Sequence, residues 1–306
     1  MMTALNRSDD LSQDTVRPPA GAATGAAAKR RPASKPWRSL STHLLLLIGC
    51  IFFAAPLLFM VSTSLKAMRQ ITRFPPEWIP NPVIWGNYPG VFTYAPMHLY
   101  FINTMIIVLP TVIGATFISS LTAYAFARLR APGKNFMFTL VLATLMLPSV
   151  VTMVPTYVLF SKLGWVGTFL PLIIPPLTGG AFYIFLLRQF FMTIPRELED
   201  AALIDGCSRF RIYWNIILPL AKPVLATVTI FAFMAAWNDY LGPLIYLGNR
   251  DQYTMSLGLQ AFVQYQRREW GMLMAASTMM VFPIIVVFFF AQKSFVQGIT
   301  VTGLKG

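Results

Sequence analysis

The segment from Glu197 to Pro219 reads ELEDAALIDGCSRFRIYWNIILP and lies between two long apolar runs. It holds four of the eleven acidic residues of the chain. Acidic side chains favour the first turn of a helix, and a glycine such as Gly206 favours its end. The pattern therefore predicts a short helix, a turn and a second helix.

The first of these helices is expected to begin at Thr193, a plausible N-cap residue, with Pro195 just inside its first turn. It should end near Gly206 after roughly ten residues. The paired small side chains of Ala201 and Ala202 would let another surface approach closely. Docking of a partner is the favoured interpretation, and a segment packed only on itself is the alternative.

The second helix is expected to start near Ser208, and Pro219 marks its return toward the membrane. Four large apolar positions follow the helical spacing i, i+3, i+4, i+7 and are expected to share one face, namely Phe210, Tyr213, Trp214 and Ile217.

The composition favours lipid over water as the solvent. Of 306 residues, 56% are hydrophobic and 11% are charged, whereas a soluble domain averages about 25% charged. Six apolar runs are long enough for membrane helices, at about 43–65, 99–127, 136–160, 170–190, 223–247 and 272–291. Five prolines within these runs predict kinks or helix ends: Pro110, Pro148, Pro155, Pro175 and Pro176.

Positive charge sets the expected orientation. With the N-terminus in the cytoplasm, 17 of the 24 Lys and Arg residues lie inside, which predicts that both termini are cytoplasmic. Residues 1–40 are predicted to be a disordered, basic cytoplasmic tail. Its run KRRPASK, residues 29–35, fits membrane retention better than binding of nucleic acid, because it adjoins a span.

The sequence predicts no metal site and no catalytic residue. Cys50 and Cys207 lie in different environments, and His43 and His98 lack zinc-ligand spacing. The chain also has no phosphate-binding motif of the form G-x-x-x-x-G-K-[ST], so ATP hydrolysis would need a partner.

The 192–222 segment resembles the signature loop of ATP-binding-cassette importer permeases, which reads E-A-A, three residues, G, nine residues, I-x-L-P. The matching residues are Asp200-Ala201-Ala202, Gly206 and Ile216 to Pro219, with Asp200 in place of the usual Glu. Three further stretches resemble the carbohydrate, maltose-type branch: PRELE at 195–199, WNDY at 237–240 and GLKG at 303–306. The resemblance covers about residues 40–306.

This resemblance implies an all-α integral membrane protein with six transmembrane helices and the type I importer, MetI-like permease fold. The permease domain would be residues 41–306, with a cytoplasmic coupling loop at 192–222, an external loop at 248–268 and a cytoplasmic tail at 293–306. The residues implied to couple to an ATPase are Glu199, Asp200, Ala201, Ala202, Asp205, Gly206, Ile216, Leu218, Pro219, Lys305 and Gly306.

The implied partners are a second permease subunit, two ATP-binding subunits that carry ATP and Mg²⁺, an extracytoplasmic solute-binding protein and a sugar. No cofactor is expected on this chain, and the expected location is a bacterial or archaeal inner membrane. The binding-protein contact would involve Tyr253, Thr254, Met255 and Ser256.

Asp239 is the acidic residue within a predicted span, and an unpaired charge there costs at least about 2.5–3.5 kcal/mol. It could line a solute pathway or cap a kink at Gly242-Pro243, and both interpretations stay open. The predicted pathway residues are Asn103, Thr104, Trp237, Asn238, Asp239 and Tyr240.

The prediction is therefore a non-enzymatic permease subunit of a sugar importer. The alternatives are a permease for polyols or glycerol phosphate, an ion-coupled transporter that uses Asp239, and a membrane scaffold without transport activity.

Overall fold

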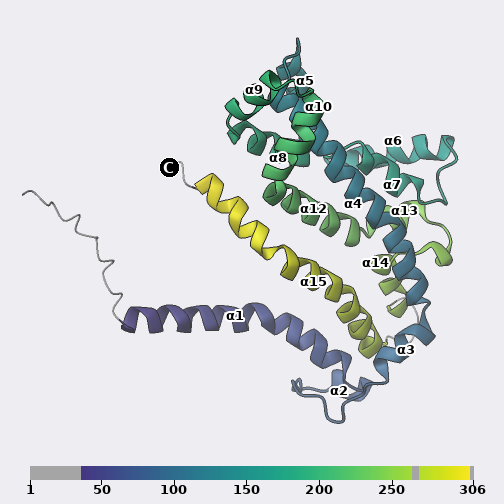
Figure 1. The fold of residues 1–306 in the computed structure, drawn as a ribbon. Helices are drawn as coiled ribbons and strands as arrows, with labels where there is room; N and C mark the ends of the chain where they lie inside the picture. The colour runs from purple at the N-terminus through teal and green to yellow at the C-terminus, as the bar shows by residue number, and fades with distance from the viewer. Residues whose placement is uncertain (1–35, 264–268, 304–306) are drawn as a thin grey trace, which may run out of the picture. The chain divides into compact units, whose positions relative to one another are not determined.

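The computed structural model describes residues 36–263 and 269–303, and every regular element in those ranges is helical (Figure 1). The chain divides into two units, residues 1–52 and 53–306, and the boundary falls inside the first helix. The helices are α1 (Pro36–Ser64), α2 (Met68–Ile71), α3 (Asn87–Tyr94), α4 (Met97–Arg128), α5 (Lys134–Ala143), α6 (Ser149–Lys162), α7 (Leu170–Leu177), α8 (Ala181–Thr193), α9 (Glu197–Ile204), α10 (Arg209–Ile212), α11 (Leu218–Leu220), α12 (Lys222–Trp237), α13 (Leu241–Tyr246), α14 (Met255–Gly258) and α15 (Trp270–Gly303). Short 3-10 turns occupy Thr144–Met146, Arg250–Gln252 and Leu259–Phe262, and a π-helix occupies Tyr213–Ile217.

Helix α4 is central to the second unit, where it packs against α7, α8 and α12. Its 32 residues extend for roughly 48 Å at 1.5 Å per residue. Small side chains on its buried face, such as Ser119 and Ala123, allow neighbouring helices to approach closely. Helices α9 and α10 lie near its C-terminal end, and α3 and α14 lie near its N-terminal end (Figure 1).

A glycine pair separates α7 from α8. Gly179 has a φ of +90°, and a Cβ built on it would lie 3.1 Å from Oγ of Ser119 in α4. The backbone N–H of Gly180 donates to the same Oγ at 3.2 Å. The break in the apolar run is therefore a packing feature that brings this backbone against α4.

By length and composition, four helical stretches in the described residues could cross a membrane: Leu40–Ser64, Met97–Arg128, Leu170–Thr193 and Trp270–Phe290. Two bent pairs raise this number to as many as six if each pair counts as one span. One pair, Lys134–Met146 with Ser149–Lys162, bends by 99° beside Pro148, where the sequence predicts a helix end. The other joins Arg209–Leu220 to Lys222–Trp237 with a bend of 82°.

The predicted fifth run, 223–247, is not one helix. It contains α12, a break at residues 238–240 and the short helix α13. Pro110 and Pro155, in contrast, lie inside α4 and α6 and do not end them.

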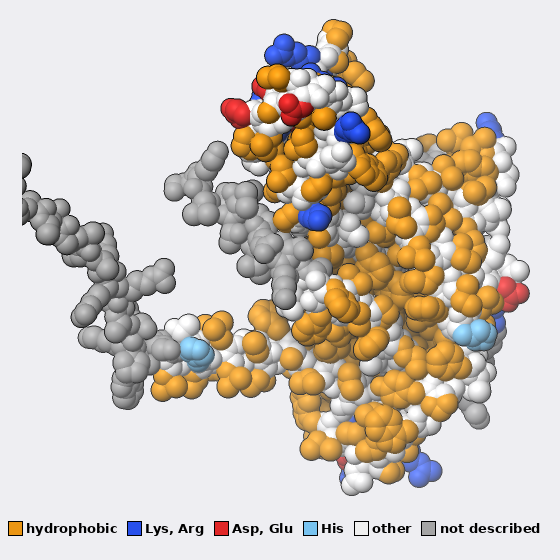
Figure 2. Space-filling view, viewed as in Figure 1, with side chains coloured by type: hydrophobic (Ala, Val, Ile, Leu, Met, Phe, Trp, Pro, Cys, Tyr) orange, Lys and Arg blue, Asp and Glu red, His pale blue; other side chains and the backbone are white. Residues whose placement is uncertain are grey.

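The surface of the second unit is largely apolar, and Figure 2 shows charged side chains gathered near α9 and α10. Large exposed apolar side chains along its helices include Leu109, Ile113, Val150, Val151, Val154 and Phe282. Water-soluble proteins rarely expose apolar surface on this scale, so the pattern indicates a lipid-facing surface.

Two buried clusters lie near opposite ends of α4. One contains Tyr124 of α4 with Phe191, Ile212 and Tyr213. The other contains Tyr100 of α4 with further apolar side chains, among them Val91, Trp237, Met255 and Phe262. The 192–222 segment and the 248–263 segment are thus each packed at a different end of the same helix.

Candidate functional site

The 192–222 segment forms the predicted helix, turn and second helix, but the first helix starts later than expected. Thr193 is the last residue of α8, and its hydroxyl donates to the carbonyl of Phe190 at 2.7 Å instead of capping α9. Ile194 is extended, with a ψ of 130°, because a residue before proline avoids the helical region. The prediction of an N-cap at Thr193 is therefore wrong, and α9 starts after Arg196.

The predicted end of α9 at Gly206 is confirmed. Gly206 has a φ of +78°, the left-handed conformation that favours glycine. The N–H of Cys207 donates to the carbonyl of Ala202 at 2.9 Å, and the N–H of Gly206 donates to that of Leu203 at 3.1 Å. This pair of bonds is a Schellman motif, which satisfies carbonyls at the end of the helix.

The second helix starts where the sequence predicts. The Ser208 hydroxyl accepts the backbone N–H of Arg211 at 3.3 Å and caps α10.

Phe210 packs against both Tyr213 and Trp214, as the helical spacing predicts, but the four side chains of the stripe are not equally buried. Tyr213 and Ile217 are fully buried, whereas Phe210 is 62% exposed and Trp214 is 52% exposed. From Tyr213 to Ile217 the chain forms a π-helix, whose i→i+5 bonds widen the turn beyond 3.6 residues. Phe210 and Trp214 stack on each other with ring centroids 6.3 Å apart and form an exposed aromatic pair.

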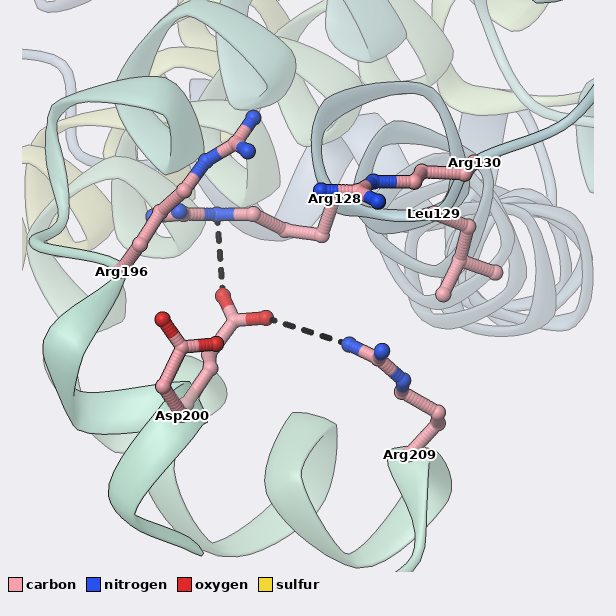
Figure 3. A pocket seen from close by; sticks show the side chains of 7 residues that line it. Arg128, Leu129, Arg130, Arg196, Asp200 and Arg209 are labelled. Carbon is pink, nitrogen blue, oxygen red and sulfur yellow. Dashed lines mark ion pairs between the residues drawn. The ribbon is translucent and has the colours of Figure 1, made fainter. Parts of the chain in front are cut away.

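A buried ion pair connects α9 to α4. Nε of Arg128 lies 3.0 Å from Oε1 of Glu199, and the two side chains are only 3% and 6% exposed. The contact has the geometry of an ion pair rather than of an aligned hydrogen bond, since neither atom has a hydrogen-bond partner. A second cation, Arg209, lies 4.0 Å from Oε2 of Glu199 and is half-exposed (Figure 3).

Arg128 also contacts α8. Its Nη2 donates to the backbone carbonyls of Phe191 and Ile194, at the C-terminal end of that helix. A cation is favourable there because the helix dipole places partial negative charge on the last carbonyls. One guanidinium therefore links the ends of α4 and α8 to the first turn of α9.

The consecutive acidic residues of α9 point in different directions. Glu199 is buried against Arg128, whereas Asp200 is exposed. Both line an open cavity of about 460 Å³, shown in Figure 3, whose other lining residues are Arg128, Leu129, Arg130, Arg196 and Arg209. The excess of arginine makes this cavity suited to an acidic or polar group of a partner.

The other predicted coupling residues divide in the same way. Ala202 is buried, and Ile216 and Leu218 are half-buried. The exposed ones in the described chain are Asp200, Ala201, Asp205, Gly206 and Pro219. Two large apolar side chains of α9, Leu198 and Ile204, are also exposed, and Ile204 is 86% exposed. Lys305 and Gly306 lie outside the described residues.

Asp239 makes the capping contact at Gly242 that the structural interpretation predicted. Its Oδ1 accepts the backbone N–H of Gly242 at 3.0 Å, which caps the start of α13. A Cβ at position 242 would lie 2.4 Å from Oδ2, so glycine is required for this close approach. Asp239 also borders a cavity of about 270 Å³ whose other polar side chains are Thr111 and Tyr183.

The neighbours of Asp239 differ in exposure. Trp237 is buried, and its Nε1–H donates to the carbonyl of Met280 at 3.1 Å. Asn238 is exposed and donates to the carbonyl of Met234 at 2.8 Å, and Tyr240 is also exposed. The cavity beside Asp239 is not lined by any of these three residues.

Asn103 and Thr104 hold the 251–255 segment against α4. Nδ2 of Asn103 donates to the carbonyls of Asp251 and Tyr253 at 2.7 and 3.1 Å, and the Thr104 hydroxyl accepts the N–H of Met255 at 2.9 Å. These contacts are structural, and a role in a solute pathway stays a prediction.

The predicted binding-protein contact is mostly buried within the chain. Thr254, Met255 and Ser256 are buried, and Tyr253 is half-buried. The Ser256 hydroxyl donates to the backbone carbonyl of Asp239, which connects this segment to the α12–α13 break. Contact of these four residues with another protein stays a prediction.

Sequence reasoning missed the role of Arg128, which it counted only as a positive charge beside a span. The available signal was an arginine directly after an apolar run together with an excess of acidic residues at 197–200. Periodicity alone does not pair residues so far apart in the chain. Within residues 36–263 and 269–303, no group of three or more His, Cys, Asp or Glu side chains could hold a metal ion.

Comparisons with known proteins agree with this architecture. Residues 115–301 match the family model described as the binding-protein-dependent transport system inner membrane component. The arabinooligosaccharides transport system permease protein AraQ of Halalkalibacterium halodurans is 35% identical over 86% of this chain and 96% of its own length. The sn-glycerol-3-phosphate transport system permease protein UgpE of Yersinia enterocolitica is 32% identical over 84% of this chain and 94% of its own length.

A solved structure shows the same fold. A chain from the crystal structure of a bacterial ABC transporter involved in the import of the acidic polysaccharide alginate superposes with a TM-score of 0.75. The match covers 86% of this chain and 99% of the other, at 23% sequence identity. The family match and the permease relatives together identify a membrane permease component that is not itself an enzyme. The chain therefore belongs to the family of inner-membrane components of binding-protein-dependent transport systems.

Proposed function

We propose that this chain is one of two transmembrane subunits of an ATP-driven sugar importer. Six membrane spans form half of the translocation pathway, and both termini are cytoplasmic in an inner membrane. A second permease supplies the other half, two ATP-binding subunits drive transport, and an extracytoplasmic binding protein delivers the solute.

The observation that carries this proposal is the division of α9 into an inner and an outer face. The inner face is fixed to α4 and α8 through Glu199 and Arg128. The outer face leaves Asp200, Ala201 and Ile204 exposed. A helix with one side attached to membrane helices and the other side free is suited to receive force from a docked subunit.

The two faces of α9 also fit a mechanism in which nucleotide binding drives a conformational change. A bound nucleotide can change the conformation of the permease only if the two states of the complex differ in affinity for it. A docked ATPase pair that closes around ATP meets this condition, because closure would displace α9 and its attached helices.

The solute is proposed to be a carbohydrate or a related polyol. The two relatives compared above are named for arabinooligosaccharides and for sn-glycerol-3-phosphate, which share multiple hydroxyl groups. Thr111, Tyr183 and Asp239 border the small cavity between α4, α7, α8 and α12 and could meet such hydroxyls. The predicted pathway residues Asn103, Thr104 and Trp237 would act mainly by holding the surrounding backbone.

Docking is tested by co-purification of the ATP-binding subunits with substituted chains. Ala201→Arg places a long cation on the exposed face of α9 and should abolish both co-purification and uptake. Gly248→Arg adds the same side chain at the other end of α4, where nothing lies within 4 Å of the new Cβ, and should leave co-purification of the ATP-binding subunits unchanged. Normal uptake with Ala201→Arg would refute the proposal that an ATP-binding subunit docks on α9.

A further inference from the structure

The geometry of Arg128 points to a mechanical role in transport. We propose that Arg128 is the positioning residue that makes α4, α8 and α9 move as one body when α9 is displaced. This inference rests on the proposed function, since it names the residue that transmits the motion of the docked helix.

The first support is that one side chain reaches three helices. Arg128 is the last residue of α4, its Nη2 donates to the carbonyls of Phe191 and Ile194 at the end of α8, and its Nε faces Glu199 of α9. A planar guanidinium has five donors in a fixed arrangement, which lets it serve two carbonyls and a carboxylate together. A lysine has a single nitrogen and could not span the same three groups.

The second support is burial. The side chains of Arg128 and Glu199 are 3% and 6% exposed. Loss of either partner would leave an uncompensated charge away from water, so the pair resists separation during a movement of α9. An exposed pair would exchange with water and transmit little force.

The third support is continuity along α4. Its opposite end holds the 251–255 segment through Asn103 and Thr104. A displacement at Arg128 would therefore reach the far end of the same unbroken helix, beside the α12–α13 break that Ser256 contacts.

The test uses the complete transporter in proteoliposomes and measures solute imported per ATP hydrolysed. Arg128→Met with Glu199→Gln removes both charges and keeps similar side-chain volumes, so no orphan charge is left to unfold the chain. The ATP-binding subunits should still co-purify and hydrolyse ATP, but import per ATP should fall about tenfold or more. An unchanged ratio would overturn the inference.

Two matched controls remove a nearby cation without touching the three-helix contact. Arg211→Gln and Lys222→Gln each change an exposed cation that does not line the arginine-rich cavity. Both should keep import per ATP within about twofold, since exposed charges contribute little. An equal loss in these controls would show a general charge effect and would contradict a special role for Arg128.

The exchanged pair, Arg128→Glu with Glu199→Arg, separates the two parts of the contact. It can restore the ion pair, but a carboxylate at position 128 cannot donate to Phe191 and Ile194. Import per ATP should stay low, and full recovery would show that α8 is not part of the linkage. Failure of the unsubstituted chain to bind the ATP-binding subunits would instead refute the proposed function.

Discussion

Oε1 of Glu199 lies 3.0 Å from Nε of Arg128, although the next residue, Asp200, faces outward. Two adjacent carboxylates of one helix thus differ in burial, although both line the same cavity. The buried one fixes α9 to α4, and the exposed one borders the open, arginine-rich cavity. Asp200, which stands at the first position of the E-A-A motif, is the exposed one of the two.

This difference predicts unequal effects of two neutralising substitutions. Glu199→Gln should leave Arg128 buried without its counter-charge and destabilise the chain, with a cost of about 3–5 kcal/mol typical of such breaks. Asp200→Asn should leave the thermal unfolding midpoint of the purified protein unchanged. Equal midpoints for the two variants would contradict the burial of Glu199.

Gly206 provides a backbone prediction. Gly206→Ala should destabilise the chain by about 1–2 kcal/mol, because an L-residue is strained in the left-handed region. The added methyl meets nothing within 4 Å, so the effect isolates the backbone conformation. Gly248→Ala, which has open space and no positive φ, should leave the unfolding midpoint unchanged.

Gly242→Ala tests the close approach at the α12–α13 break. The new methyl would lie 2.4 Å from Oδ2 of Asp239 and 2.8 Å from Cδ2 of Leu172, and relieving such contacts typically costs about 1–3 kcal/mol. A lower thermal midpoint is expected. Gly242→Ala should cost less in a chain that already carries Asp239→Ala than in the unsubstituted chain, because one of the two colliding groups is then absent.

Asp239→Asn discriminates between the capping role and ion coupling. Asparagine caps a helix as well as aspartate does, so uptake should stay within about twofold of the unsubstituted transporter. A proton-coupled transporter would lose uptake, because an amide cannot carry the proton. Uptake driven by a proton gradient without ATP would contradict the importer proposal directly.

The orientation is tested by a cysteine placed at the most exposed part of α9. With Cys50 and Cys207 replaced by serine, Ile204→Cys should react with a membrane-impermeant thiol reagent only when the cytoplasmic face is accessible. Ile204 is 86% exposed within the chain, so burial does not limit the reaction. Labelling from the outside of intact cells would refute a cytoplasmic 192–222 segment.

Local sequence signals predict most of the helix boundaries in the 192–222 segment. Gly206 and Ser208 act within a few residues of themselves, so their positions predict the turn and the second cap correctly. The prediction of an N-cap at Thr193 was wrong because Ile194 precedes a proline and interrupts the helix there. The helical spacing places Phe210 beside Tyr213 and Trp214 correctly, but it does not indicate that Tyr213 is buried while the other two are exposed.

Contacts between residues far apart in the chain could not be predicted from local sequence patterns. Nothing local to Arg128 indicates that its guanidinium meets Glu199 and two carbonyls of α8. Similarly, Asn103 looks like a pathway residue in sequence, yet its amide is used by the carbonyls of Asp251 and Tyr253. A polar residue in an apolar run indicates that its side chain needs a hydrogen-bond partner. Only the packed fold shows which group that partner is.

Because both ends of α4 are bonded to other segments, the rotation between Asn103 and Arg128 about the helix axis is fixed, and so is the distance between them. Each residue turns an α-helix by about 100°, so one residue inserted between Asn103 and Arg128 would swing one set of bonds away from its partners. An insertion in this stretch should therefore be tolerated only with a compensating deletion that restores both the rotation and the length of the helix. The rotational register of α4 is thus under the same constraint as its end groups.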